Sequence, residues 1–457
     1  MGPGPGPAGA IMKHELATVH HLPHELISYI FSIGRDGDDN AIPYLRTISS
    51  VCSVWRDVAI STSNLWTTIV YEPYAFPPPT HPQPIFIPLT RRRIESEASR
   101  VCERVETFLV RSRSSSIDLV VIIREHNVKQ IQRITNIVMS HLWRCRSLTI
   151  CYDDSAVPST FFPLPGRLER LEKLESLAQH HASFGAATLF TEHSAPSLRT
   201  LCLTPAHGLA RSMDFIPNTL TRLDLVTGLE AIGRVKFMQF LRQCTMLERL
   251  RLLELLTRDL LPDNFIPVSL PSLKSLHVYD TLALDFRMYL STPNIVELHL
   301  SGDMFHPGVP PEPPNAQPTM LQIETVKWDR QSLRGLRHHM MPFSSVKNLI
   351  LRDCVGVSDL VCYLATGFPD EPVQTPTDPL EALSRLEYMG IEDSGDEEND
   401  EEGEMAETTQ WLKILLSRRA SLRVAVTRCV IDDPAAFAEQ FGARFAVVER
   451  EWHSVVF

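Results

Sequence analysis

Cysteine and histidine side chains are the first candidates for nucleophilic or metal chemistry in this chain of 457 residues. The nine cysteines are scattered, and none of them forms a Cys-x-x-Cys pair. The three His-His pairs, at 20–21, 180–181 and 338–339, have no cysteine pair at metal-ligand spacing. Neighbours in sequence also point in different directions on a helix or strand. We therefore expect no metal site and no cofactor.

The motifs of common enzyme classes are absent from the sequence. It contains no G-x-x-x-x-G-K-[ST] and no G-x-S-x-G, and its one G-x-G-x-x-G match, from Gly4 to Gly9, lies in the opening Gly/Pro stretch and follows no predicted strand. A cysteine nucleophile would need a base nearby in space, which no motif here supplies. We expect no catalytic residue and no enzyme. The alternative is a polar pocket in which ionisable side chains converge from distant parts of the chain.

Composition narrows the compartment and the partners. An odd number of scattered cysteines in apolar surroundings fits reduced thiols in the cytoplasm or nucleus. The opening MGPGPGPAGA lacks the features of a signal peptide, and no apolar run is long enough for a membrane span. Nine acidic residues between Glu392 and Glu404 account for most of the net charge of −11. The near-neutral remainder argues against a nucleic-acid partner, and we expect no membrane partner.

The segment from Leu22 to Trp66 predicts three short helical pieces. Apolar residues recur at helical spacing in its first part and again around Trp55. A Gly/Asp-rich stretch separates the first two pieces. Forty-odd residues cannot bury so much apolar surface alone, so the surface must dock on a partner or on the rest of this chain.

The same segment resembles the F-box-like module of fungal substrate receptors. The resemblance rests on "LPHELISYIF", "LRTISSVCSVWRDVAIST" and "NLWTTIVY", and is strongest at Leu22-Pro23, Glu25-Leu26, Cys52-x-x-Trp55-Arg56 and Leu65-Trp66. The Gly/Asp-rich insert departs from the family pattern. The resemblance implies docking on a Skp-type adaptor, which links to cullin and RING subunits of an SCF ubiquitin ligase. The residues expected to anchor the adaptor or the small helical core are Leu22, Pro23, Leu26, Ile27, Ile30, Phe31, Val51, Cys52, Trp55, Val58, Leu65 and Trp66.

The pattern L-x-x-L-x-L recurs along the later chain, mostly at steps of 22 to 28 residues. It begins at Leu198-Leu201-Leu203, and we place its later copies at Ile323-Val326-Trp328 and Leu383-Leu386-Tyr388 among others. Alternation puts the leucines on one face of each strand. Stacked strand-plus-helix units then form a curved parallel sheet with one open face. The pattern resembles degenerate leucine-rich repeats attached to F-boxes. The alternative is a mixed α/β globule with chance leucine spacing.

The open face of this sheet is the predicted substrate surface. Mixed charges with an occasional aromatic residue suit protein or peptide recognition. The alternative for each residue is an ordinary solvated position. The predicted face residues are Arg222, Asp224, Arg249, Arg251, His277, Tyr279, His299, Lys327 and Arg352.

The predicted fold class is α/β: a small all-helical F-box-like module followed by an irregular leucine-rich-repeat-like α/β solenoid with one curved, mainly parallel sheet. The acidic tract cannot repay the entropy of folding, and Ser394 within it is a candidate phosphorylation site or part of an unregulated solvated loop. The predicted divisions are a disordered Gly/Pro arm (1–18), the module (19–70), a Pro-rich linker (71–94), the solenoid (95–390), an acidic disordered loop (391–408) and a C-terminal cap (409–457).

These observations predict an interaction protein. The first hypothesis is the substrate-recognition subunit of an SCF-type ubiquitin ligase, with the F-box on the adaptor and the repeats on an unknown protein target. The second is a non-catalytic repeat scaffold whose F-box-like segment is only a structural cap. Deleting residues 1–70 separates them, because a scaffold should aggregate without its cap.

Overall fold

The computed structural model describes most of the chain outside its longer loops. The predicted arm, most of the Pro-rich linker, Lys327 and Ser394 lie outside the described residues. The described residues are 22–36, 41–72, 91–123, 128–152, 161–164, 166–178, 188–190, 195–204, 209, 211–226, 233–253, 265–279, 289–301, 318–326, 328, 345–366, 383–392, 402–426, 431 and 433–447.

Three short helices open the described chain: α1 (His24–Asp36), α2 (Ala41–Val51) and α3 (Ser53–Ser61), followed by the 3-10 helix η2 (Ser63–Trp66). The carbonyl of Pro23 accepts hydrogen bonds from two amides in the first turn of α1, those of Leu26 and Ile27. Cys52 separates α2 from α3 and caps the latter, since its sulfur accepts a hydrogen bond from the amide of Trp55 at 3.4 Å. The predicted N-terminal helical region is therefore confirmed.

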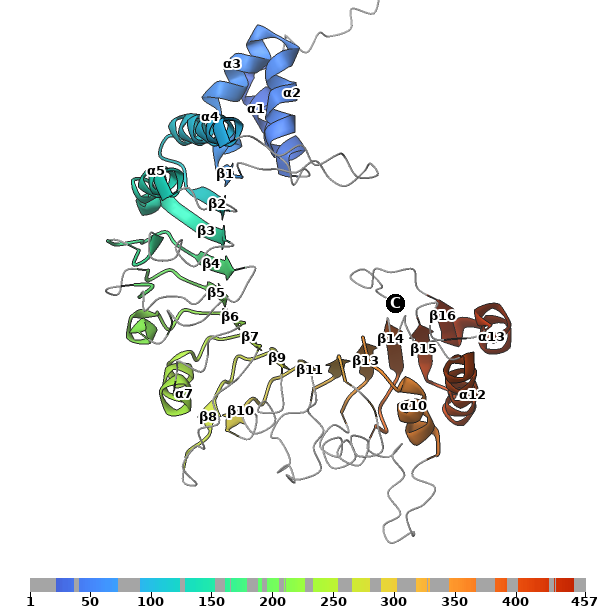
Figure 1. Ribbon diagram of the computed structural model, residues 1–457. Coiled ribbons are helices and arrows are strands. Elements are labelled where there is room, and N and C mark those ends of the chain that lie inside the picture. Colours follow the sequence, from blue (N-terminus) through green and yellow to red (C-terminus); the bar gives the residue numbers. More distant parts are fainter. Residues whose placement is uncertain are drawn as a thin grey trace, which may run out of the picture.

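Among the described residues, fourteen parallel strands form one sheet, and they lie side by side in chain order. They line the inner side of an open arc, with the N-terminal helices at one end (Figure 1). The predicted α/β class with a large, mainly parallel sheet is confirmed. The strands are β1 (Thr68–Tyr71), β2 (Ile117–Ile123), β3 (Cys145–Tyr152), β4 (Lys173–Ala178), β5 (Thr200–Thr204), β6 (Arg222–Leu225), β7 (Arg249–Leu252), β9 (Ser275–Tyr279), β11 (Glu297–Ser301), β12 (Met320–Glu324), β13 (Asn348–Arg352), β14 (Tyr388–Glu392), β15 (Arg423–Val426) and β16 (Phe445–Val447).

Helices and a small second sheet form the outer side of the arc (Figure 1). Parallel neighbours need crossover connections, and these elements occupy them. The helices are α4 (Arg91–Arg111), α5 (Val128–Met139), α7 (Arg234–Gln243), α10 (Val357–Thr366), α12 (Glu402–Arg418) and α13 (Pro434–Phe441). The 3-10 turns are η3 (Leu142–Arg144), η5 (Met213–Phe215) and η9 (Gly442–Arg444), and the second sheet pairs β8 (Val268–Ser269) with β10 (Leu290–Ser291).

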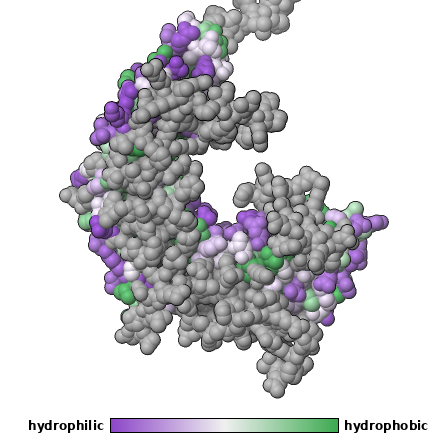
Figure 2. All heavy atoms as spheres, viewed as in Figure 1, coloured by the Kyte–Doolittle hydropathy of each residue, from purple (hydrophilic) through white to green (hydrophobic). Residues whose placement is uncertain are grey.

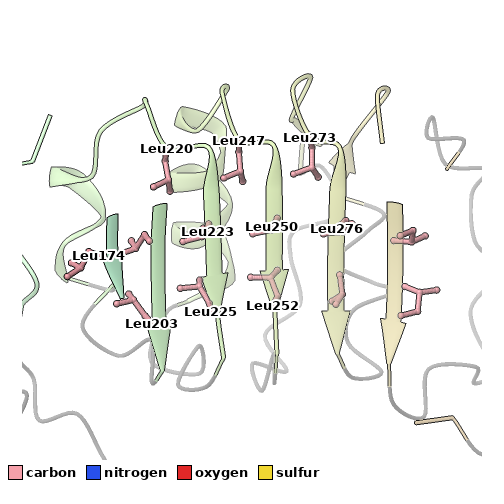
Figure 3. Close-up of a cluster of buried hydrophobic side chains, with 14 of the residues drawn as sticks. Leu174, Leu203, Leu220, Leu223, Leu225, Leu247, Leu250, Leu252, Leu273 and Leu276 are labelled. Atoms are coloured by element: carbon pink, nitrogen blue, oxygen red, sulfur yellow. The ribbon is translucent and has the colours of Figure 1, made fainter. Parts of the chain in front are cut away.

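Rows of leucines hold successive strands in register. Leu223 pairs with Leu250, which pairs with Leu276, and all three are buried. Figure 3 shows these rows side by side, with Leu220, Leu247 and Leu273 forming a further row where each chain segment enters its strand. Because side chains alternate along a strand, burying one row fixes the register and turns the intervening residues to the other face.

The N-terminal helices and the sheet share one hydrophobic core. Strand β1, directly after η2, pairs with β2 and so forms the first strand of the sheet. The rings of Trp66 and Phe108 meet edge to face at 4.9 Å, which joins η2 to α4. The linker predicted from residue 71 to 94 is therefore too long at both ends: Tyr71 ends β1, and α4 begins at Arg91. Proline composition alone did not show that Thr68 to Tyr71, with three β-branched residues, would form the first strand of the sheet.

Two predicted repeat motifs are wrong in register. The strand placed around Val326 is Met320–Glu324, so Gln322 occupies the position in the row that was assigned to Lys327. The strand placed around Leu386 is Tyr388–Glu392, in which Met389 and Ile391 face the core. In both cases several apolar residues fall at nearly equivalent spacings, so the motif fits more than one register.

The segment between β14 and α12 is shorter than the acidic loop that the sequence predicted. Strand β14 continues to Glu392 and helix α12 begins at Glu402, both inside the range 391–408. Glu, Met and Ala have high helix propensity, which explains an early helix start. The described strands of the predicted cap, β15 and β16, extend the same sheet.

Candidate interaction surfaces

Helix α1 carries apolar side chains on two faces. Ile27 and Phe31 point into the core and are almost fully buried. Leu26, Tyr29, Ile30 and Ile33 follow the spacing i, i+3, i+4, i+7 and are 48% to 64% exposed. A contiguous exposed stripe of this kind on a small helical unit indicates a protein interaction site. We call these four residues the α1 stripe.

The structure divides the twelve residues predicted to anchor an adaptor or the helical core. Pro23, Leu26, Ile30 and Val51 are exposed; Leu22, Cys52 and Trp55 are half-buried; Ile27, Phe31, Val58, Leu65 and Trp66 are buried. The sequence prediction missed Tyr29 and Ile33. Their signal was available, because both lie one helical turn from predicted neighbours.

Trp55 and Trp66 have internal contacts that hold the helices together. The ring of Trp55 meets Phe31 edge to face at 5.0 Å. The indole N–H of Trp66 donates to the carbonyl of Ala59 at 2.8 Å, and the guanidinium of Arg111 lies 4.4 Å from its ring. Arg35 at the end of α1 donates to the carbonyl of Asn64 and to Thr67 and Thr68. These contacts hold α1, and with it the α1 stripe, in a fixed position on the helical unit.

A hollow of about 1170 Å³ lies along the inner face of the sheet from β6 to β15. Hydrophilic residues line the inner side of the arc where it is visible in Figure 2. Seven of the nine predicted face residues line the hollow: Arg222, Asp224, Arg249, Arg251, His277, His299 and Arg352. Tyr279 is 38% exposed at the end of β9 but does not line the hollow, and Lys327 lies outside the described residues.

Strand register explains why these residues come together. Asp224, Arg251, His277, His299 and Gln322 occupy one row across five neighbouring strands. The hollow also contains residues that the sequence prediction did not include. Among these are Glu324 and Glu392, whose positions follow from the corrected register. Glu297, on the correctly predicted strand β11, also lines the hollow.

Two ion-pair groups order the polar side chains of the hollow. Arg222 donates twice to one carboxylate oxygen of the buried Asp224, at 2.9 and 2.5 Å. Arg352 donates to Glu392 at 2.6 Å and to Glu324 at 3.3 Å, across three adjacent strands. The hydrogen bond to Glu392 raises the pKa of Arg352, so this guanidinium stays charged.

Two imidazoles lie between these groups. The rings of His277 and His299 are 5.2 Å apart, centre to centre. Burial is the main cause that lowers both pKa values, and it lowers the pKa of His277 to about 3. The imidazoles are therefore neutral at pH 7 and form an uncharged centre of the hollow.

The hollow offers little for nucleophilic chemistry. Burial raises the pKa of the Cys202 thiol, in the same row as Asp224, to about 12, which keeps it protonated. In the described part of the chain, no three His, Cys, Asp or Glu side chains come together as a metal site. The arrangement suits binding by charge and hydrogen bonds.

Among the helices that the structure describes, none is both long and apolar enough to cross a membrane.

Comparison with known proteins adds one finding. No curated protein matches the chain. The N-terminal helices, which include the α1 stripe, and strand β1 lie within a segment that matches a family model. Residues 19–72 match the F-box-like family model, which supports an F-box protein and suggests an adaptor-binding role in SCF-type complexes.

Proposed function

We propose that this protein is a substrate receptor of an SCF-type ubiquitin ligase. In this proposal the α1 stripe binds a Skp-type adaptor, and the hollow binds a protein target. The adaptor links the chain to cullin and RING subunits, which supply catalysis, so the chain itself is not an enzyme. It acts in the cytoplasm or nucleus.

The observation that carries the proposal is the α1 stripe within an F-box-like match. The opposite face of α1 packs into the core through Ile27 and Phe31, while the four residues of the α1 stripe remain exposed. Packing within the described chain therefore does not explain why these four positions are apolar. Four large apolar side chains on one exposed face supply the kind of anchors that dominate protein interfaces. The half-buried Trp55 and the exposed Val51 extend the proposed contact.

The sheet and its leucine rows support a leucine-rich-repeat-like recognition domain. One strand per repeat, leucines toward the core and polar residues toward the open side match that architecture. A repeat scaffold without a ligase is the second candidate, and one observation favours it: β1 completes the sheet, so the N-terminal helices do cap it. The two functions are compatible unless the α1 stripe binds no adaptor.

Co-purification of the full chain with a Skp-type adaptor tests the proposal. The double substitution Ile30→Asp, Ile33→Asp changes only exposed positions of the α1 stripe, and we expect at least a tenfold weaker complex. The matched control is Val110→Asp, Ile266→Asp, which places the same charges at exposed apolar positions elsewhere. If the wild-type chain ignores the adaptor while its circular dichroism shows a folded protein, the scaffold function replaces the receptor function.

A further inference from the structure

The hollow has unbalanced positive charge at one end. Arg249 and Arg251 project from β7, and both are exposed. Within the described residues neither guanidinium group has an ion-pair or hydrogen-bond partner. The neighbouring Arg222 and Asp224 neutralise each other. Two free guanidinium groups on one strand form a site for an anionic group, because guanidinium binds carboxylate and phosphate through parallel hydrogen bonds.

Negative charge is in excess farther along the same hollow. Three carboxylates line this part of the hollow: Glu297 on β11, Glu324 on β12 and Glu392 on β14. Arg352 forms ion pairs with both Glu324 and Glu392. The nearest basic group to Glu297 among the described side chains is the His299 imidazole at 4.0 Å. That imidazole is neutral at pH 7 because burial lowers its pKa. Arg423 on β15 lies beyond this acidic region, at the far end of the hollow.

The two charged regions have a defined separation. From β7 to β12 the sheet passes β9 and β11, which makes three strand spacings of about 4.8 Å, or roughly 14 Å in total. An extended peptide rises about 3.3 Å per residue, so residues i and i+4 lie roughly 13 Å apart and on the same side. The uncharged pair His277 and His299 lies between the two regions.

Resting on the proposed function, we propose that the hollow recognises an extended segment of the target that carries an anionic and a cationic side chain about four residues apart. The anionic group binds Arg249 and Arg251, and the cationic group, from lysine or arginine, binds Glu297 and Glu324. The acidic region is the reason that the ligand is a peptide, since three carboxylates on the same face repel a nucleic-acid backbone. The anionic group is a carboxylate or a phosphate.

Selection of random twelve-residue peptides by display against the intact adaptor-bound chain tests this proposal. We expect enriched peptides to carry an acidic and a basic residue at i and i+4. The double variant Arg249→Glu, Arg251→Glu should bind those peptides at least tenfold more weakly, and a new selection on it should favour a basic residue in place of the acidic one. Both side chains are exposed and unpartnered among the described residues, so the fold should persist.

The matched control is Arg100→Glu, Arg167→Glu, which makes the same charge change at exposed arginines outside the hollow. This control should bind the selected peptides like wild type. Resynthesis of one peptide with phosphoserine or with alanine at the acidic position separates phosphate from carboxylate as the source of the anion. Enriched peptides without the charge pair, unchanged binding by the double variant, or no enrichment by a chain that still binds its adaptor would each overturn the proposal. Loss of adaptor binding instead counts against the proposed function alone.

Discussion

Replacement of Trp66 by alanine should destabilise the junction between the N-terminal helices and the sheet. Trp66 is 3% exposed, packs edge to face on Phe108 and donates its N–H to the carbonyl of Ala59. Trp→Ala in a core costs about 3–5 kcal/mol, and leaving the Ala59 carbonyl without its donor costs about 1 kcal/mol or more. Because the cavity can partly relax, we expect a loss of about 4 kcal/mol in the free energy of unfolding.

Urea unfolding followed by fluorescence and hydrogen exchange measures this loss. In the variant, amides of α4 and β2 should lose protection, whereas those of β12 and β13 should change little, because β12 and β13 lie far along the sheet. The matched control Trp66→Phe keeps an aromatic ring against Phe108 but removes the N–H, and should cost about 1–2 kcal/mol. A loss below about 1 kcal/mol for alanine, or unchanged exchange in α4, would refute the shared core.

Three further perturbations test the fold and the hollow. Gly356→Ala should lower the free energy of unfolding in urea by more than about 2 kcal/mol, because a Cβ at φ +70° would lie 2.4 Å from the carbonyl oxygen of Trp328. The control is Gly442→Ala, at φ +54° with open space around the Cβ, which should cost only about 1 kcal/mol. Equal costs for the two variants would contradict the clash at Gly356. The folded-state pKa of His277, about 3, lies below the unfolded value of 6.5, so stability should fall as pH drops below 6.5, by at most about 1.4 kcal/mol per unit. In His277→Gln this pH dependence should flatten in urea titrations, and an unchanged slope would exclude His277 as its source. Deletion of residues 1–72 should expose the β2 edge and cause self-association in size-exclusion chromatography, for a receptor as well as for a scaffold, because β1 belongs to the sheet. A monomeric product would show that β1 is dispensable.

The central repeats could be predicted residue by residue because three apolar positions constrain each one. In Leu220-x-x-Leu223-x-Leu225, one leucine marks the turn and two mark the strand, so a shift of one residue would turn Arg222 and Asp224 toward the apolar core and the leucines away from it. That is why the predicted row from Asp224 to His299 agrees with the observed pairing.

The later repeats failed for a related reason. Around β12 the sequence LQIETVKW contains Leu321, Ile323, Val326 and Trp328, all of which are buried. Two of them lie in the strand, and the other two bury their side chains after it. Period alone cannot choose between those sets, whereas hydrogen bonding to β11 and β13 does. The acidic side of the hollow was missed as a consequence, because Glu324 belongs to the corrected strand.

In the N-terminal helices, the sequence could identify the apolar positions but not the direction in which each one points. Ile27 and Ile30 look equivalent as letters, yet one is 1% exposed and the other 50%. The difference arises from the packing of α1 on α3 and η2, and Arg35 at the end of α1 donates to the carbonyl of Asn64 in η2. The helical spacing of apolar residues in the sequence does not show such tertiary contacts.

The shared core has a geometric consequence for the proposed receptor. Because β1 is both the end of the F-box-like match and the first strand of the sheet, no flexible joint separates the N-terminal helices from the strand that follows them. Six strand spacings separate β1 from β7, so the free arginines lie roughly 29 Å along the sheet from the N-terminal region. A bound target would therefore be held at a separation set by strand count, and removal of one strand-plus-crossover unit would shorten it by about 4.8 Å. A receptor that only tethered its target would tolerate that removal, whereas a receptor that positions its target should shift which lysines are modified.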